Sequence, residues 1–196
     1  MNENAPLRTQ AALDSPCVRT TLNTMLTIVD NAAADQMRIE SATIEDLPEL
    51  TDLVGSLLAM EADFRPDAEK QRHGLQLILE QPSRGRIFVL RNDYKVIGMV
   101  NLLFTISTAE GGFVLLMEDV IIRREHRGHG YGTRLVDYVK EFAAKKDFKR
   151  ITLLTDRVSA ESQRFFERNG FVLSHMVPMR LLLKGEMSPF QRASGS

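Results

Sequence analysis

The sequence predicts a single α+β domain, in which a mixed, mostly antiparallel sheet is flanked by helices and preceded by an N-terminal extension. Segments with apolar residues at helical spacing alternate with short apolar, β-branched runs typical of strands. Turn signals at Asn92-Asp93 and Gly111-Gly112 join three of these runs directly, as in antiparallel hairpins. The length of 196 residues suits one domain with tails. We divide it into an extension (1–36), the domain (37–184) and a C-terminal tail (185–196).

The composition is typical of an ordinary soluble globular protein. A net charge of −1 and a pI near 6.4 argue against a general nucleic-acid binder, which would be strongly basic. Cys17 is the one cysteine, so an intramolecular disulfide framework and a cysteine-rich metal site are excluded. Apolar runs are too short to span a membrane, and the N-terminus lacks a basic, then apolar leader. We therefore expect a cytoplasmic protein without a metal, a membrane or a nucleic acid as partner.

The extension contains one candidate helix. Apolar residues fall at helical spacing between Val18 and Val29, in a stretch otherwise rich in polar residues. Such a helix could dock on its own domain or contact a second copy of the chain, and the second alternative would give a homodimer.

The domain begins with a strand and two helices. Met37–Ala42 alternates as a strand does, and Thr43 stands three residues before Asp46 in a capping-box pattern. An apolar stripe predicts a helix over Leu47–Leu58, with Pro48 in its tolerant first turn. A second helix is predicted over Asp67–Glu80.

Strands dominate the middle of the chain, and helices alternate with strands after it. The predicted elements are strands at Arg86–Arg91, Lys95–Ser107 and Phe113–Ile122, a helix through Leu135–Ala143, a strand at Ile151–Thr155, a short helix at Ser159–Arg168, which Asn169-Gly170 ends, and a closing strand within Phe171–Leu183.

A glycine-rich loop lies between the third of these strands and the helix that follows. Gly128, Gly130 and Gly132 stand at alternate positions, which removes each Cβ from one side of the turn and lets backbone N–H groups converge. The helix start adds unpaired N–H groups and the positive end of a dipole. Nearby arginines add charge, at Arg123, Arg124, Arg127 and Arg134. The loop therefore has the chemistry of a phosphate or pyrophosphate cradle.

Two other interpretations of the loop compete with this one. A glycine-rich turn often does no more than start a helix. A dinucleotide site is also conceivable, with Asp156 as the ribose-binding acid after the next strand. However, the spacing is G-x-G-x-G rather than G-x-G-x-x-G, and 40 residues after Asp156 are too few for a doubly wound sheet.

A family resemblance supports the cradle. The letters R-G-H-G-Y-G at Arg127–Gly132 fit the Q/R-x-x-G-x-G/A signature of the GNAT superfamily of acyl-CoA-dependent N-acetyltransferases. Ser159–Phe171 is similar to that family's second motif, N-x-x-A-x-x-F-Y-E-x-x-G-F, in the right order. The resemblance covers roughly residues 37–184. It implies a GNAT-like fold, acetyl-CoA as co-substrate, and acetyl transfer to a primary amine of a small-molecule or amino-acid-like acceptor through a ternary complex.

The resemblance also implies roles for individual residues. The cradle would bind the diphosphate of coenzyme A, and the exposed edge of the preceding strand would pair with the pantetheine arm and supply an oxyanion-stabilising N–H. The cofactor-binding residues so implied are Val120, Ile121, Ile122, Arg127, Gly128, His129, Gly130, Tyr131, Gly132, Thr133 and Ser159.

Glu118 is the candidate catalytic base. A lysine-like amine has a pKa near ~10.4, so a carboxylate or a relayed water must collect its proton before attack. Glu118 lies on the strand beside the expected acetyl site, although it could equally be a solvated or salt-bridged residue. Asp119 is expected on the opposite face by the period of two, unless a bulge interrupts the count. Glu61 and Asp63 either wall the acceptor site or form an ordinary acidic loop.

One departure from the family pattern concerns the leaving group. Phe166 occupies the place where family members often carry a tyrosine that protonates the thiolate. The thiolate, with a thiol pKa near ~8.5, could leave unaided, or another group could protonate it. Alternatively, the domain is a CoA-binding sensor or regulatory module with little turnover.

Overall fold

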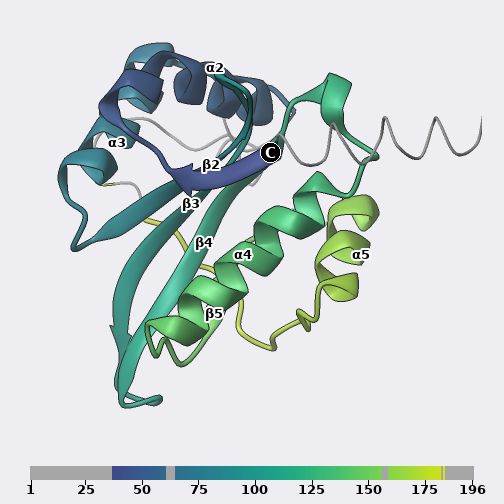
Figure 1. Cartoon of the computed structure of the whole chain (residues 1–196). Helices are drawn as coiled ribbons and strands as arrows, with labels where there is room; N and C mark the ends of the chain where they lie inside the picture. Colours follow the sequence, from purple (N-terminus) through teal and green to yellow (C-terminus); the bar gives the residue numbers. More distant parts are fainter. Residues whose placement is uncertain (1–36, 61–64, 156–158, 182, 184–196) are drawn as a thin grey trace, which may run out of the picture. The chain divides into compact units, whose positions relative to one another are not determined.

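The computed structural model describes residues 37–60, 65–155, 159–181 and 183. Within these residues the sheet has five strands in the order β1-β2-β3-β4-β5 (Figure 1). Strands β2, β3 and β4 are antiparallel neighbours, and β5 is parallel to β4. This confirms the predicted mixed, mostly antiparallel sheet. The strands are β1 (Met37–Ser41), β2 (Gly85–Asn92), β3 (Lys95–Ser107), β4 (Gly112–Ile122) and β5 (Ile151–Leu153).

Helices cover both faces of this sheet, and their bounds follow the predicted ones closely. They are η1 (Ile44–Asp46), α2 (Leu47–Leu58), α3 (Ala68–Glu80), η2 (Arg124–His126), α4 (Tyr131–Lys145) and α5 (Ala160–Arg168). Figure 1 shows α4 lying across the sheet with α5 beside it, while α2 and α3 lie together at the other end of the view. All of these helices belong to the unit Ile39–Ser196.

The core has one layer on each side of the sheet. On one side, buried Ile87, Val89 and Met99 pack with the apolar stripes of α2 and α3. On the other side, Phe88 meets Tyr138 and Phe142 of α4 edge-on, with ring centroids 5.0 and 5.1 Å apart. Successive residues of β2 thus serve opposite layers, as the two-residue period of a strand requires.

Side chains start the helices where the sequence predicts. The backbone N–H of Thr43 donates to Asp46 Oδ2 at 2.8 Å, the returning half of the predicted capping box. Asp67 Oδ1 accepts the backbone N–H of Lys70 at 3.1 Å and caps α3. At the end of α5, Gly170 adopts a φ of +89° just after Asn169, which is the left-handed geometry that stops a helix.

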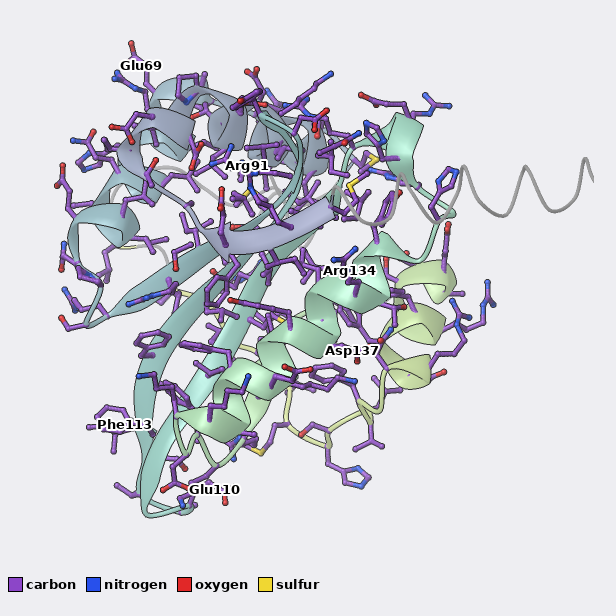
Figure 2. All side chains as sticks on the ribbon, viewed as in Figure 1. Glu69, Arg91, Glu110, Phe113, Arg134 and Asp137 are labelled. Carbon is purple, nitrogen blue, oxygen red and sulfur yellow. The ribbon has the colours of Figure 1, made fainter. Side chains whose placement is uncertain are left out.

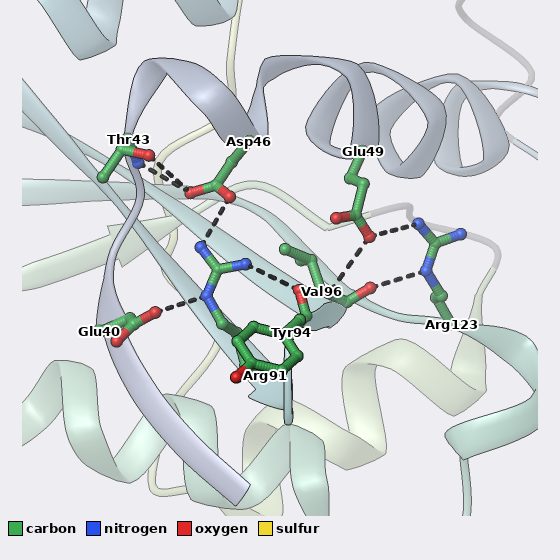
Figure 3. A network of polar contacts seen from close by, with 8 residues as sticks. All are labelled: Glu40, Thr43, Asp46, Glu49, Arg91, Tyr94, Val96 and Arg123. Carbon is green, nitrogen blue, oxygen red and sulfur yellow. Dashed lines mark hydrogen bonds and ion pairs between the residues drawn. The ribbon is translucent and has the colours of Figure 1, made fainter.

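A polar network joins the start of α2 to the β2–β3 hairpin (Figure 3). The Arg91 guanidinium donates to Glu40 and, at 2.6 Å, to Asp46 Oδ1. The side chains of Arg91 and Asp46 are 11% and 7% exposed, so this ion pair is largely removed from water. Their mutual neutralisation allows two charges to remain under the helix.

The predicted closing strand is wrong. Residues 171–181 contain no strand, and apolar side chains there are exposed, including Val172, Met176 and Met179. A strand needs a neighbour with which to pair, and β5 ends at Leu153, two residues earlier than predicted. The predicted extension helix lies outside the described residues. The boundaries of the extension, the domain and the tail stay predictions. None of the helices in the described ranges combines the length and apolar character that crossing a bilayer requires.

Candidate functional site

A β-bulge interrupts β4 at the predicted base. In the β3–β4 ladder, Asn101 is opposite Glu118 and Met99 is opposite Ile121, so Asp119 and Val120 together face Val100. Asp119 adopts a φ of +51°, in the left-handed region that aspartate tolerates better than most residues.

The bulge brings both acidic side chains to Asn101. The Nδ2 group of Asn101 donates to Asp119 Oδ2 at 3.3 Å, and Asn101 is also the cross-strand partner of Glu118. The expectation that Asp119 faces away from Glu118 is therefore wrong, because the extra residue breaks the period of two. Asn101 is two residues from Met99, so this polar group lies on the face that α2 and α3 cover.

Both carboxyl groups hold protons more strongly than usual. Burial raises the pKa of Glu118, and the negative charge of Asp119 raises it further, while the charge of Arg180 lowers it. Burial also raises the pKa of Asp119, and the hydrogen bond from Asn101 partly opposes that rise. Glu118 thus has the environment of a proton acceptor rather than of a solvated surface acid.

The edge of β4 is open next to this group. The parallel ladder with β5 joins Leu115–Met117 to Ile151–Leu153 and then ends. In the described part of the chain, Val120, Ile121 and Ile122 therefore have β3 as their strand neighbour on one side and none on the other. Such an edge can pair with an extended, amide-containing ligand.

Arg123, one of the arginines expected to add charge near the cradle, binds residues of the protein itself. Its Nε donates to the carbonyl oxygen of Val96 at 2.8 Å, and its guanidinium lies 3.6 Å from Glu49 Oε2 (Figure 3). Glu49 also accepts the backbone N–H of Val96 at 3.1 Å. Arg123 is therefore an anchor that ties the end of β4 to β3 and α2.

The loop after η2 is held by its own side chains. Arg127 Nε donates to the carbonyl oxygen of Ile122 at 2.9 Å. His129 Nδ1 donates to the carbonyl oxygen of Arg127 at 2.8 Å, and its ring stacks on Tyr131 with centroids 5.8 Å apart. These contacts fix the loop against the last residues of β4.

Two of the three glycines shape the cradle. Gly128 and Gly130 have φ values of +81° and +78°, and an added Cβ at either would meet no atom within 4 Å. The first backbone bond of α4 runs from Arg134 N–H to Gly130 O, so the N–H groups of residues 131–133 precede intrahelical pairing. Arg134 adds its charge in the first turn of α4 (Figure 2). This open helix start fits a diphosphate.

Gly132 lies where α4 approaches α5. A Cβ at Gly132 would lie 3.2 Å from Phe165 Cζ, so the missing side chain lets α4 and α5 approach closely. Thr133 is exposed on the first turn of α4.

The second motif forms α5. Ser159 is its N-cap and accepts the backbone N–H of Ser162 at 3.3 Å. Phe166 packs against Phe165 and Phe171 and offers no hydroxyl. Glu61, Asp63 and Asp156 lie outside the described residues.

Sequence reasoning overlooked Asn101. It is 3% exposed and is the one polar side chain in the otherwise apolar run Val96–Leu103. A lone amide in such a run is a usable signal, because buried polar groups need partners.

The fold and this arrangement define a class of proteins in which a strand, a glycine-rich loop and a helix hold a cofactor beside a strand-borne acid. The chain belongs to the acetyltransferase (GNAT) family, whose model matches residues 54–171, more than half of the sequence. The match contains both the cradle and the whole of the second motif.

Known relatives agree with this assignment. The chain is 25% identical over 137 residues to aminoalkylphosphonate N-acetyltransferase of Salmonella typhimurium, covering 70% of this chain and 86% of the relative. A possible acetyltransferase from Clostridium difficile 630 superposes with a TM-score of 0.71 at 16% identity, covering 76% and 99% of the two chains. An aminoglycoside acetyltransferase from an uncultured soil metagenomic sample, solved with sisomicin, gives a TM-score of 0.64 at 21% identity, covering 77% and 99%.

Proposed function

We propose that this N-acetyltransferase moves the acetyl group of acetyl-CoA to a primary amine of a small-molecule or amino-acid-like acceptor, by direct attack in a ternary complex. The observation that most supports this proposal is the position of Glu118, at the bulge where the open edge of β4 begins. Two of the relatives are named for amine-bearing small molecules, an aminoalkylphosphonate and an aminoglycoside, which supports this substrate class.

Acetyl-CoA supplies the acetyl group as a thioester. The N–H groups of residues 131–133 and the open turn at Gly128 and Gly130 would hold its diphosphate, with Arg127 and Arg134 close in sequence. Backbone groups of Val120, Ile121 and Ile122 would pair with the pantetheine arm and polarise the thioester carbonyl. Ser159 would contribute only if its capping hydroxyl also reaches the cofactor, because the cap already uses its acceptor oxygen.

Glu118 would act as the general base. A proton passes from the acceptor ammonium to the Glu118 carboxylate, which frees the nitrogen lone pair for attack on the thioester carbon. A C–N bond forms, the C–S bond breaks and the electron pair leaves on sulfur, while the nitrogen loses its second proton to the solvent and becomes a neutral amide. Phe166 cannot protonate that sulfur, but a thiol pKa near ~8.5 lets the thiolate leave and take its proton from water.

The test is a thiol-release assay on the full chain. The panel contains aminoalkylphosphonates, aminoglycosides and amino acids, each with acetyl-CoA, and mass spectrometry identifies the acetylated product. We expect release with at least one amine, and we expect Glu118→Gln to reduce it by about 10²–10⁴-fold. Glu69→Gln is the matched control, since Glu69 is exposed on α3 (Figure 2).

A CoA-binding sensor is the second candidate, and Phe166 is the observation that favours it. Tight binding of CoA in calorimetry, with no thiol release above background across the panel, would establish the sensor and exclude the enzyme mechanism given above.

A further inference from the structure

The buried amide of Asn101 destabilises the folded state. Its side chain is 3% exposed, its Nδ2 donates to Asp119, and its Oδ1 has no hydrogen-bond partner among the described residues. A buried acceptor without a partner destabilises the folded state, so an apolar residue would suit this buried position better. Its retention beside two carboxyl groups indicates a task other than packing.

We propose that Asp119, held by Asn101, is a positioning residue that sets the proton affinity of Glu118. The inference rests on the proposed function, in which Glu118 is the base. Its geometric foundation is the bulge, which lets Asp119 accept a hydrogen bond from Asn101, the residue that lies opposite Glu118 on the next strand.

The chemistry explains why a second acid is useful. An ordinary glutamate has a pKa near ~4.3, about six units below that of a primary ammonium group, so it is a weak base toward that substrate. A base works best when its pKa approaches the working pH. The negative charge of Asp119 makes Glu118 hold a proton more tightly. This reduces the difference between the pKa of Glu118 and the pKa of the ammonium group.

Two charged groups of the described chain act on Glu118, in opposite directions. Burial is the largest cause of the raised pKa of Glu118. Asp119, on the same strand, raises this pKa further, and Arg180, on the segment after α5, lowers it. Glu49, on the helix that covers this face, is engaged by Arg123 and Val96 instead.

The hydrogen bond from Asn101 favours the ionised form of Asp119. Donation from Nδ2 stabilises the ionised carboxylate and opposes the effect of burial. If Asp119 takes up a proton, rotation of the amide presents Oδ1 as an acceptor for the new O–H group. An amide can therefore form a hydrogen bond with Asp119 whether Asp119 is ionised or protonated. A lysine would favour the ionised form alone, and a leucine could bind neither form.

The proton balance of the reaction is unchanged by this arrangement. One proton moves from the acceptor nitrogen to a Glu118 oxygen, an N–H bond is exchanged for an O–H bond, and Asp119 exchanges no proton in that step. Asp119 contributes charge alone.

The test is a direct titration of the side-chain carboxyl carbons by ¹³C NMR, on the full chain without CoA or acceptor. Asp119→Asn keeps the left-handed backbone and the size of the side chain but removes the charge. Asp119→Gly removes the charge and tolerates the same backbone. In both variants Glu118 should titrate at lower pH than in the wild type. An unchanged Glu118 titration in both would overturn the proposal.

Asn101→Leu and Arg180→Gln extend the test with further predicted directions. Asn101→Leu should raise the pKa of Asp119 and thereby lower that of Glu118, since a neutral neighbour no longer repels the second charge. Arg180→Gln should raise the pKa of Glu118. If Asn101→Leu does not fold, the two Asp119 variants decide the question.

Activity separates this inference from the proposed function. The acid limb of the kcat profile should move to lower pH in Asp119→Asn, while a merely structural role would lower kcat without moving that limb. Shifted NMR titrations without any thiol release would leave the tuning of Glu118 intact and refute the acetyl transfer.

Discussion

The guanidinium of Arg123 lies 3.6 Å from Glu49 Oε2, and this pair fastens the strand that leads into the cradle to helix α2. The same arginine donates to the Val96 carbonyl, so one side chain connects three elements. The loop beyond it therefore starts from a fixed point.

Replacing Arg123 should lower the free energy of unfolding more than replacing its neighbour Arg124. We expect Arg123→Gln to lower the free energy of unfolding by about 1.5 kcal/mol, the lower end for hydrogen bonds to charged groups, because the pair is partly exposed. Arg124→Gln, at an exposed position, should change it by less than about 0.5 kcal/mol. Urea denaturation measures both, and equal losses would contradict the anchoring role.

A charge placed in the cradle should abolish coenzyme A binding. Gly130→Glu puts a carboxylate where the diphosphate is expected, at a φ of +78°. Gly111→Glu is the matched control, because Gly111 has a similar φ of +64° and open surroundings, at the opposite end of β4. Calorimetry should detect binding to the control and none to Gly130→Glu. Retained affinity in both would refute the cradle.

Gly132 and Phe165 should be energetically coupled. Gly132→Ala adds a Cβ only 3.2 Å from the phenyl ring, and Phe165→Leu removes that obstacle. In a double-mutant cycle, the alanine should be less destabilising in the Phe165→Leu background, with a coupling of about 0.5–3 kcal/mol. Gly128→Ala, whose Cβ would meet open space, should show no coupling with Phe165.

Replacing only one partner of the Arg91–Asp46 ion pair should strongly destabilise the folded state. Arg91→Met leaves the Asp46 carboxylate buried without its partner and should cost about 3–5 kcal/mol in the free energy of unfolding. The double variant Arg91→Met with Asp46→Asn removes both charges and should recover part of that loss. A double variant as unstable as the single one would show that packing, not charge, is responsible.

Glu118 should lower stability where it is ionised. The pKa of Glu118 is raised in the folded state, so the folded chain binds more protons than the unfolded chain between the two pKa values, and stability falls as pH rises through that window. Glu118→Gln has no such loss, so its melting temperature should exceed that of the wild type above the window. Melting curves of both at several pH values test the sign, with Glu69→Gln expected to follow the wild type.

Periodicity was sufficient to predict most of the fold. The apolar stripe of Leu47–Leu58 and the branched run of Arg86–Arg91 are local patterns, and each forms the element that its pattern indicates. The predicted closing strand within Phe171–Leu183 is absent from the described residues, because an apolar stretch supplies no partner strand. Local pattern specifies what a segment can become, while pairing depends on a neighbour elsewhere in the chain.

The candidate site was less accessible to such reasoning. The sequence named Glu118 and the cradle glycines as candidates, and it counted Arg123 among the arginines that add charge near the cradle, because charge alone carries no direction. The bulge at Asp119 is a backbone event of one residue, and counting in twos across it placed Asp119 on the wrong face. Asn101 contributes through a cross-strand pairing that no nearby residue reveals.

The distortion at Asp119 also bears on whether a second chain can add a strand to this edge. An open strand edge is a template on which other chains add strands and aggregate. A bulge increases the local twist and breaks the even spacing of the backbone groups, so a regular strand from another molecule fits the edge of β4 poorly. The irregularity that gathers two acids around one amide thus also discourages cross-β stacking along the exposed edge.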